Sequence, residues 1–117
     1  MYAHYSAYVI GIHRLHLSAH FKQESNESLI HADTVRSAIV KLGGIAITDR
    51  DQTKIIHSTS YKEMLEQALQ TETGAAKTYG ELLKLIEVSG DRELYDSIEA
   101  IYFAEVRSVE EMRMMMA

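Results

Sequence analysis

The sequence of 117 residues contains no cysteine and no proline, and only six glycines. Without cysteine the chain has no disulfide, no thiolate metal site and no cysteine nucleophile. Without proline, and with so few glycines, little in the chain interrupts a helix, which favours long helices. Basic tracts are missing too. The chain has 12 Lys and Arg against 17 Asp and Glu, a formal net charge of −5. We therefore do not expect sequence-independent binding to the phosphates of nucleic acid, which needs a basic surface.

Long apolar runs are also absent. No stretch approaches the length of a membrane span, and the first residues lack the basic-then-apolar layout of a signal peptide. We therefore expect a cytoplasmic protein that binds neither nucleic acid nor membrane. Hydrophobic residues make up 46% and charged residues 25%, as in globular proteins, and the length fits a single domain over residues 1–117.

The few helix-breaking residues divide the chain. Gly43-Gly44 is the first stop after about forty residues. The segment Ile45–Thr59 holds Asp, Thr and β-branched residues without a sustained helical period, which indicates a long connection. Ser60 and Glu63 then fit a capping box, which predicts a helix from Ser60 to about Val88.

A tight break follows at Ser89–Asp91. Gly90 suits the left-handed position after a helix, and Asp91 is a good N-cap for a last helix that runs to about Met116. Before Gly43, Ser18 is a plausible N-cap for the second helix. The pattern therefore predicts four helices.

Each predicted helix carries a stripe of residues at alternating spacings of three and four, which is typical of a helix that buries one face. The stripes are Tyr2, Tyr5, Val9, Ile12 and His16; Phe21, Glu24, Ser28, His31, Val35, Ala38 and Leu42; Leu65, Ala68, Glu72, Ala75, Tyr79, Leu82 and Ile86; and Leu94, Ile98, Ile101, Glu105, Ser108, Met112 and Met115. The methionines and tyrosines read as packing residues, with Tyr79 and Tyr102 the nearest to any polar site.

The connections set the topology. The short turn at Ser89–Asp91 makes the last two helices antiparallel neighbours, while the connection after Gly43 is long enough to run back along a bundle. We therefore expect an all-α four-helix bundle with a long crossover between helices two and three, and a short or truncated first helix. If Tyr2–Leu42 formed one long helix, another chain would have to complete the bundle, so we expect a homodimer or a higher homo-oligomer.

Ionisable residues stand in three of the stripes where apolar ones belong, among them His31, Glu72 and Glu105. Glu72 lies 17 residues before Ser89, and Glu105 lies 15 residues after Gly90, so across a hairpin they face each other to within about half a turn. A helix that starts near Ser18 puts His31 at the same level. Burying an unpaired carboxylate is costly, so core carboxylates need a partner, a proton or a metal. Imidazole nitrogen with carboxylate oxygen suits iron, manganese or zinc, which predicts a metal site of His31, Glu72 and Glu105.

The glutamates and histidines on the stripes also have interpretations that involve no metal. A glutamate on a stripe often reaches solvent at the edge of the core, and a lone histidine is more often hydrogen-bonded in the core than bound to metal. Glu24 lies two turns from His31, too far to share its ion, whereas Glu27 is one turn away and could share it. Three further histidines form a separate group near the junction of the first two helices, where solvated positions are favoured: His13, His16 and His20.

These residues resemble the ferritin-like superfamily, and most of all its bacterioferritin branch. Glu24-Ser25 followed by His31-Ala32-Asp33 is similar to the second-helix segment of that family, where Glu-x-x-His precedes Ala-Asp. Glu72 with Ala75-Ala76-Lys77 resembles its third-helix glutamate followed by Gly-Ala-Lys, and the spacing from Glu72 to Glu105 matches the family without a gap. The segment from Asp33 to Gly44 is also similar to the DNA-protecting mini-ferritins. The resemblance covers roughly residues 18–117.

The chain departs from the family pattern at the ligands of a diiron site, which takes a glutamate from each of two helices and Glu-x-x-His from each of the other two. The second-helix motif has Ser28 in place of a bridging glutamate, and the fourth-helix motif has Ser108 in place of histidine. The first-helix glutamate has no clear counterpart, since only His4 falls in a similar context. Leu29 stands where bacterioferritins have their haem-binding methionine, so we expect no haem.

Two functions remain open. The resemblance implies a metal-binding ferritin-like protein, able to bind or oxidise iron through an incomplete diiron-carboxylate site, with manganese or zinc as other candidates for His31, Glu72 and Glu105. The alternative is a non-catalytic structural or interaction bundle that retains remnants of the site. In such a bundle Glu72 and Glu105 would be hydrogen-bonded to each other, to His31, or to Ser28 and Ser108. No catalytic residue can be assigned. A DNA-protecting role is disfavoured by the acidic balance and by the lack of a Lys-rich tail.

Overall fold

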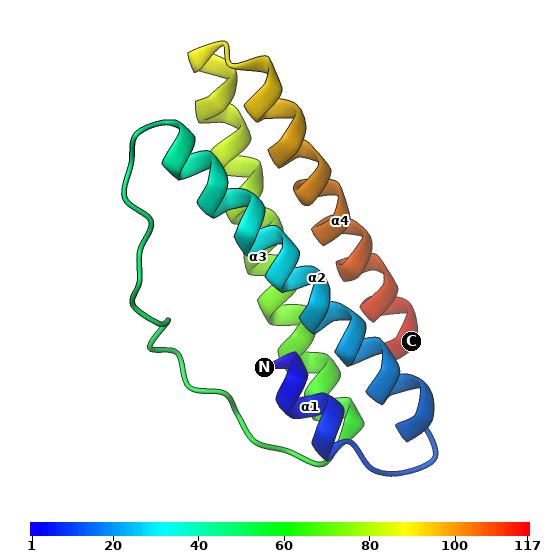
Figure 1. Ribbon diagram of the computed structural model, residues 1–117. Helices are drawn as coiled ribbons and strands as arrows, with labels where there is room; N and C mark the ends of the chain where they lie inside the picture. Colours follow the sequence, from blue (N-terminus) through cyan, green and yellow to red (C-terminus); the bar gives the residue numbers. More distant parts are fainter. The chain divides into compact units, whose positions relative to one another are not determined.

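The computed structural model describes residues 1–117, and all of its regular structure is helical (Figure 1). Four helices follow one another: α1 (Tyr2–Tyr8), α2 (Arg14–Lys41), α3 (Tyr61–Ser89) and α4 (Arg92–Met116). No helix is both long and apolar enough to cross a membrane. The predicted all-α class, the four helices and the long connection over residues 42–60 are confirmed.

The chain forms two compact units, Met1–Met64 and Leu65–Ala117. The first holds α1, α2, the connection and the opening turn of α3. The second holds the rest of α3 together with α4. Each unit is described by itself.

In the first unit, α1 and α2 are separate helices. α1 is seven residues long and ends at Tyr8. Its C-cap residue, Val9, has an extended backbone and a fully buried side chain. α2 begins at Arg14, four residues before the predicted cap at Ser18, and its N-cap residue His13 makes no side-chain capping bond. Ser18 has another role, because its hydroxyl donates to the Ser6 carbonyl while the Ser6 hydroxyl donates to the Ser18 carbonyl, both at 2.8 Å.

Aromatic packing joins α1 to α2. The ring of Phe21 lies 5.9 Å from the ring of Tyr2 and 6.0 Å from that of Tyr5, measured between centroids. These rings and Leu17 are buried, as a helix too short to be stable alone requires. The predicted stripe was wrong at its end, because Ile12 lies in the break between the helices and is 90% exposed.

The second half of α2 buries less than its stripe predicted. Phe21 and Glu24 are buried, but Ser28 is exposed, His31 is partly exposed and Leu42 is 65% exposed. The expected core face of this helix therefore holds only for its first half.

The start of α3 is capped by Ser60 and Glu63, as in a capping box, together with a third residue, Ser58. The Glu63 backbone N–H donates to the Ser60 hydroxyl at 3.5 Å, as predicted. The Glu63 carboxylate does not take the Ser60 N–H directly. It accepts from the Ser58 hydroxyl at 2.7 Å, and that hydroxyl accepts from the Ser60 N–H at 3.0 Å. Ser58 is buried, so this relay fixes the end of the connection as well as the start of the helix.

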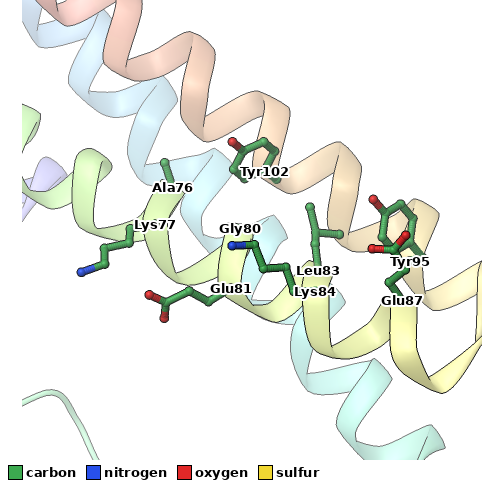
Figure 2. Close-up of a pocket in the computed structure, with 9 residues that line it drawn as sticks. All are labelled: Ala76, Lys77, Gly80, Glu81, Leu83, Lys84, Glu87, Tyr95 and Tyr102. Atoms are coloured by element: carbon green, nitrogen blue, oxygen red, sulfur yellow. The ribbon is translucent and has the colours of Figure 1, made fainter.

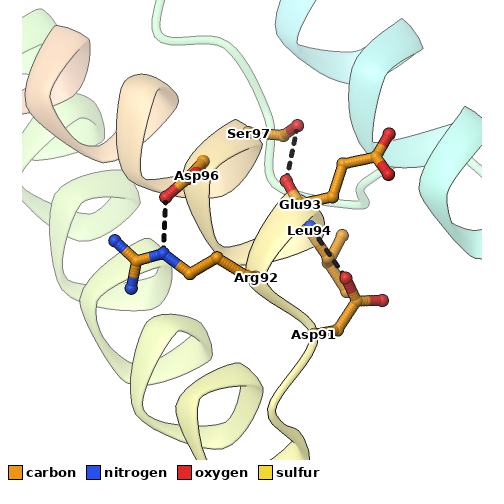
Figure 3. A network of polar contacts seen from close by, with 6 residues as sticks. All are labelled: Asp91, Arg92, Glu93, Leu94, Asp96 and Ser97. Carbon is orange, nitrogen blue, oxygen red and sulfur yellow. Dashed lines mark hydrogen bonds and ion pairs between the residues drawn. The ribbon is translucent and has the colours of Figure 1, made fainter.

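The second unit is an antiparallel hairpin, with α3 in green to yellow and α4 in orange to red side by side in Figure 1. Gly90 makes the turn with φ of +76°, a conformation that L side chains rarely adopt, and the prediction for this glycine is confirmed. Asp91 caps α4, since its carboxylate accepts from the Leu94 N–H at 3.0 Å (Figure 3). The first turns of α4 also carry an ion pair from Arg92 Nε to Asp96 Oδ1 at 3.3 Å.

The hairpin packs closely at Gly80. A Cβ built on this residue would lie 3.2 Å from Cε1 of Tyr102, so any larger residue requires the ring to shift by a few tenths of an ångström. The buried apolar residues of the unit come from both helices: Leu65, Ala68, Leu83, Ile86, Ile98, Ile101, Val109 and Met112. They match most of the predicted stripes of these two helices.

Candidate metal centre

The second unit buries three polar side chains at stripe positions. Glu72 on α3 is 4% exposed, and Glu105 and Ser108 on α4 are 8% and 9% exposed. Glu105 and Ser108 are one turn apart, so they lie on the same face of α4. The hairpin thus carries one buried carboxylate on each helix, Glu72 and Glu105, and the buried hydroxyl of Ser108 one turn after Glu105.

A third carboxylate is buried in the first unit, on α2. Glu24 is 8% exposed, and its Oε1 lies 3.9 Å from Nε2 of His20 one turn earlier. The hydroxyl of Ser28 donates to the Glu24 backbone carbonyl at 2.9 Å, so this serine bonds along its own helix. His31 is partly exposed, and Glu27 is also partly exposed.

Glu24 and His31 both stand on the predicted stripe of α2, and the sequence predicts His31 as a ligand. Glu24, one turn after Phe21, is buried, whereas His31 lies where the stripe becomes exposed. Glu72 and Glu105 share one unit, and His31 lies in the other. Within neither unit do three or more His, Asp or Glu side chains form a group that could hold a metal ion.

A groove of about 600 Å³ opens on the α3–α4 hairpin (Figure 2). Its lining mixes tyrosine rings, small residues and charged side chains: Ala76, Lys77, Gly80, Glu81, Leu83, Lys84, Glu87, Tyr95 and Tyr102. Neither buried glutamate of the hairpin is part of this lining. Tyr79, beside the groove residue Gly80 in sequence, is partly buried, and this burial raises the pKa of its phenol.

The two buried carboxylates of the hairpin, Glu72 and Glu105, are oxygen donors of the kind that hard and borderline cations accept. Carboxylate oxygens, with imidazole as a further donor, are the ligands that iron, manganese and zinc accept. Ser28 and Ser108 fit less well, because neutral hydroxyls bind these ions poorly. The residues present thus fit a carboxylate-bound ion better than a bridged pair of ions.

Comparisons with known proteins agree with this fold. A model of the Ferritin family, described as a ferritin-like domain, matches residues 1–117. A solved structure from Bacillus anthracis str. Ames, titled as ferritin-like, diiron-carboxylate proteins, is similar over 99% of this chain and 82% of that one, with 28% identity and a TM-score of 0.91. No protein in the curated set matches. The predicted ferritin-like four-helix bundle with a long connection between helices two and three is confirmed, and the chain belongs to the ferritin-like domain family.

Proposed function

We propose that the protein binds a metal ion, iron first and manganese or zinc as alternatives, through the carboxylates of Glu72 and Glu105. The burial of both side chains is the observation that carries this proposal. Removing a carboxylate from water costs several kcal/mol unless a proton, a partner or a cation compensates. The two glutamates are 33 residues apart, on the two helices of one hairpin, in a family with a diiron-carboxylate relative. A bound cation would offset the cost of burying both negative charges.

We further propose His31 as a ligand, the residue of the second helix that the sequence predicts for this role. Its side chain is partly exposed. Titration of His31→Ala with metal, beside Glu72→Ala and Glu105→Ala, tests this prediction.

The proposed site holds one ion rather than a bridged pair. A bridged pair needs carboxylates shared by both metals, and Ser28 and Ser108 stand at two of the family's ligand positions. Iron, when bound, would supply one-electron redox chemistry. The chain itself would hold the ion, balance its charge with Glu72 and Glu105, and exclude water by burying both. The proposal is therefore metal binding, not efficient iron oxidation.

One observation favours a second candidate, a structural bundle that retains only remnants of the site. Ser108 is 9% exposed at the position of the family histidine. A buried hydroxyl can donate to a carboxylate but ligates these metals weakly. In a structural bundle one carboxyl would hold a proton, because two nearby charges in a core cannot both ionise cheaply, and no metal would be needed.

Thermal unfolding of metal-free protein separates the two candidates. Fe(II) under anaerobic conditions, Mn(II) and Zn(II) are added in turn. At about 100 times Kd an ion should add about 2.7 kcal/mol, which raises Tm by roughly 10 °C in a chain of this length. Glu72→Ala and Glu105→Ala should abolish the rise. The exposed glutamates of the same helices provide matched controls, Glu66→Ala and Glu110→Ala, which should keep it. A Tm unchanged by all three ions well above micromolar concentration would support the structural bundle.

We also propose that the chain works as a homodimer or a higher homo-oligomer. Large apolar side chains stand exposed on α2, with Leu29 69% and Ile30 64% exposed, and the connection adds Ile45 at 95%. Association between copies of the chain would remove these side chains from water, which is favourable. Sedimentation equilibrium tests the proposal. A purely monomeric protein at micromolar concentration would contradict it, and Leu29→Glu should shift an oligomer toward monomer.

A further inference from the structure

Two histidines that are 53 residues apart in the chain meet in the first unit. Nε2 of His4, on α1, lies 2.8 Å from Nδ1 of His57, near the end of the connection. The rings meet edge to face, with centroids 5.1 Å apart and planes inclined by 77°. One nitrogen donates to the other, so at least one imidazole of the pair is neutral in this arrangement.

The surroundings hold this pair in place. The ring of Tyr8 lies 4.5 Å from that of His4 and 4.8 Å from that of His57. The residues on both sides of His57 are anchored: the Tyr5 hydroxyl donates to the Ile56 carbonyl at 2.8 Å, and Ser58 takes part in the relay at the start of α3. Tyr5 is fully buried, and burial, with the nearby charge of Glu63, raises the pKa of its phenol, so it stays a donor at neutral pH.

We propose that His4 and His57 form a binding site for a late first-row divalent metal ion, copper(II) above all. This site is separate from the buried glutamates. Two nitrogens 2.8 Å apart subtend about 86° at an ion that binds each at about 2.05 Å. An angle near 90° fits neighbouring positions of the tetragonal geometry of Cu(II) and Ni(II). Tetrahedral zinc would need the nitrogens roughly 3.3 Å apart, so zinc binding requires the pair to open.

A neutral His4–His57 pair can bind an ion without releasing a proton. A neutral imidazole carries one proton on two nitrogens. Each ring can therefore keep its proton on the nitrogen that faces away, Nδ1 of His4 and Nε2 of His57, and turn a lone pair toward the ion. The hydrogen bond between the rings is replaced by two metal–nitrogen bonds, and no proton leaves the neutral pair. Water completes the coordination, since His57 is exposed. The ion would tie the connection to α1.

The test uses the full chain, freed of metal, at a pH of about 7.5, where imidazole is mostly neutral. Copper(II) is added at one equivalent, with Mg(II) as the comparison ion. Electron paramagnetic resonance should show copper with two nitrogen ligands. Trypsin cleavage after the exposed Arg50 and Lys54 in the connection should slow several-fold with copper and not with Mg(II). His57→Ala, digested at the same copper concentration, should show no slowing.

Matched variants exclude other copper sites. His16 is exposed and lies one turn before His20, a spacing that can itself bind copper, so His16→Ala should leave the copper spectrum and the slowed cleavage unchanged. Glu72→Ala should also leave both unchanged, which separates this site from the core. His4→Asn removes the same pair with little loss of packing and should act like His57→Ala. Copper binding that survives His57→Ala, or that is lost in His16→Ala, would overturn the proposal, as would no binding at micromolar copper.

Discussion

The close approach of α4 to α3 at Gly80 predicts opposite outcomes for two glycine substitutions on one helix. At Gly74 an added Cβ meets no atom within 4 Å, so Gly74→Ala should stabilise the protein by about 0.8–1.0 kcal/mol, the helix-propensity difference. At Gly80 the added Cβ would lie 3.2 Å from Cε1 of Tyr102. Overpacking costs about 1–3 kcal/mol, and the partial exposure of Tyr102 keeps this cost near the lower end. Gly80→Ala should therefore gain nothing or lose stability.

Urea unfolding followed by circular dichroism measures this difference. With an m-value of about 2 kcal/mol/M, the midpoint of Gly74→Ala should rise by about half a molar, and that of Gly80→Ala should stay level or fall. In a Tyr102→Ala background, Gly80→Ala should become stabilising, because the opposing ring is gone. If Gly80→Ala stabilises the protein with Tyr102 intact as much as Gly74→Ala does, the ring does not lie against Gly80.

Two further predictions concern caps and tyrosines. Asp91→Ala removes the carboxylate that accepts from the Leu94 N–H, and it should lower the free energy of unfolding in urea by about 1 kcal/mol. Asp96→Ala breaks only an exposed ion pair and should lower it by less than about 0.5 kcal/mol. Equal losses in the two variants would contradict the capping role of Asp91. Burial raises the phenol pKa of Tyr5 and Tyr79 above 10.0 in the folded state, so their contribution to stability is full below pH 10 and is lost as pH rises through the raised values. Tyr79→Phe should flatten the fall in unfolding free energy between about pH 9.5 and 11, and an unchanged slope would contradict this.

The helices could be predicted because their signals are local. Glycine and capping residues mark their ends, and Gly90 and Asp91 behave as their chemistry dictates. The stripe of α4 and both ends of the stripe of α3 also follow from the sequence. The middle of the α3 stripe is only partly buried, at Ala75, Tyr79 and Leu82. The start of α2 could not be predicted. His13 carries no capping bond, and Ser18, which resembles a cap, bonds across to Ser6.

The site could be predicted only in part, because burial is a tertiary property. Glu72 and Glu105 stand on strong stripes, and both are buried. On α2 the stripe contains both Glu24 and His31, and the spacing alone does not show that the helix becomes exposed between them. No local pattern links His4 to His57, because the long connection brings these two residues together.

Calorimetric titration of metal-free protein with Fe(II), without oxygen, tests whether Glu72 and Glu105 hold an ion. We expect saturable binding of a single ion per chain. Glu72→Ala and Glu105→Ala should each lose it, and the exposed controls Glu66→Ala and Glu110→Ala should retain it. Binding of two ions per chain with rapid oxidation on exposure to oxygen would contradict the single-ion site. The absence of binding well above micromolar Fe(II), or binding that both glutamate variants retain, would contradict the claim that these carboxylates hold metal.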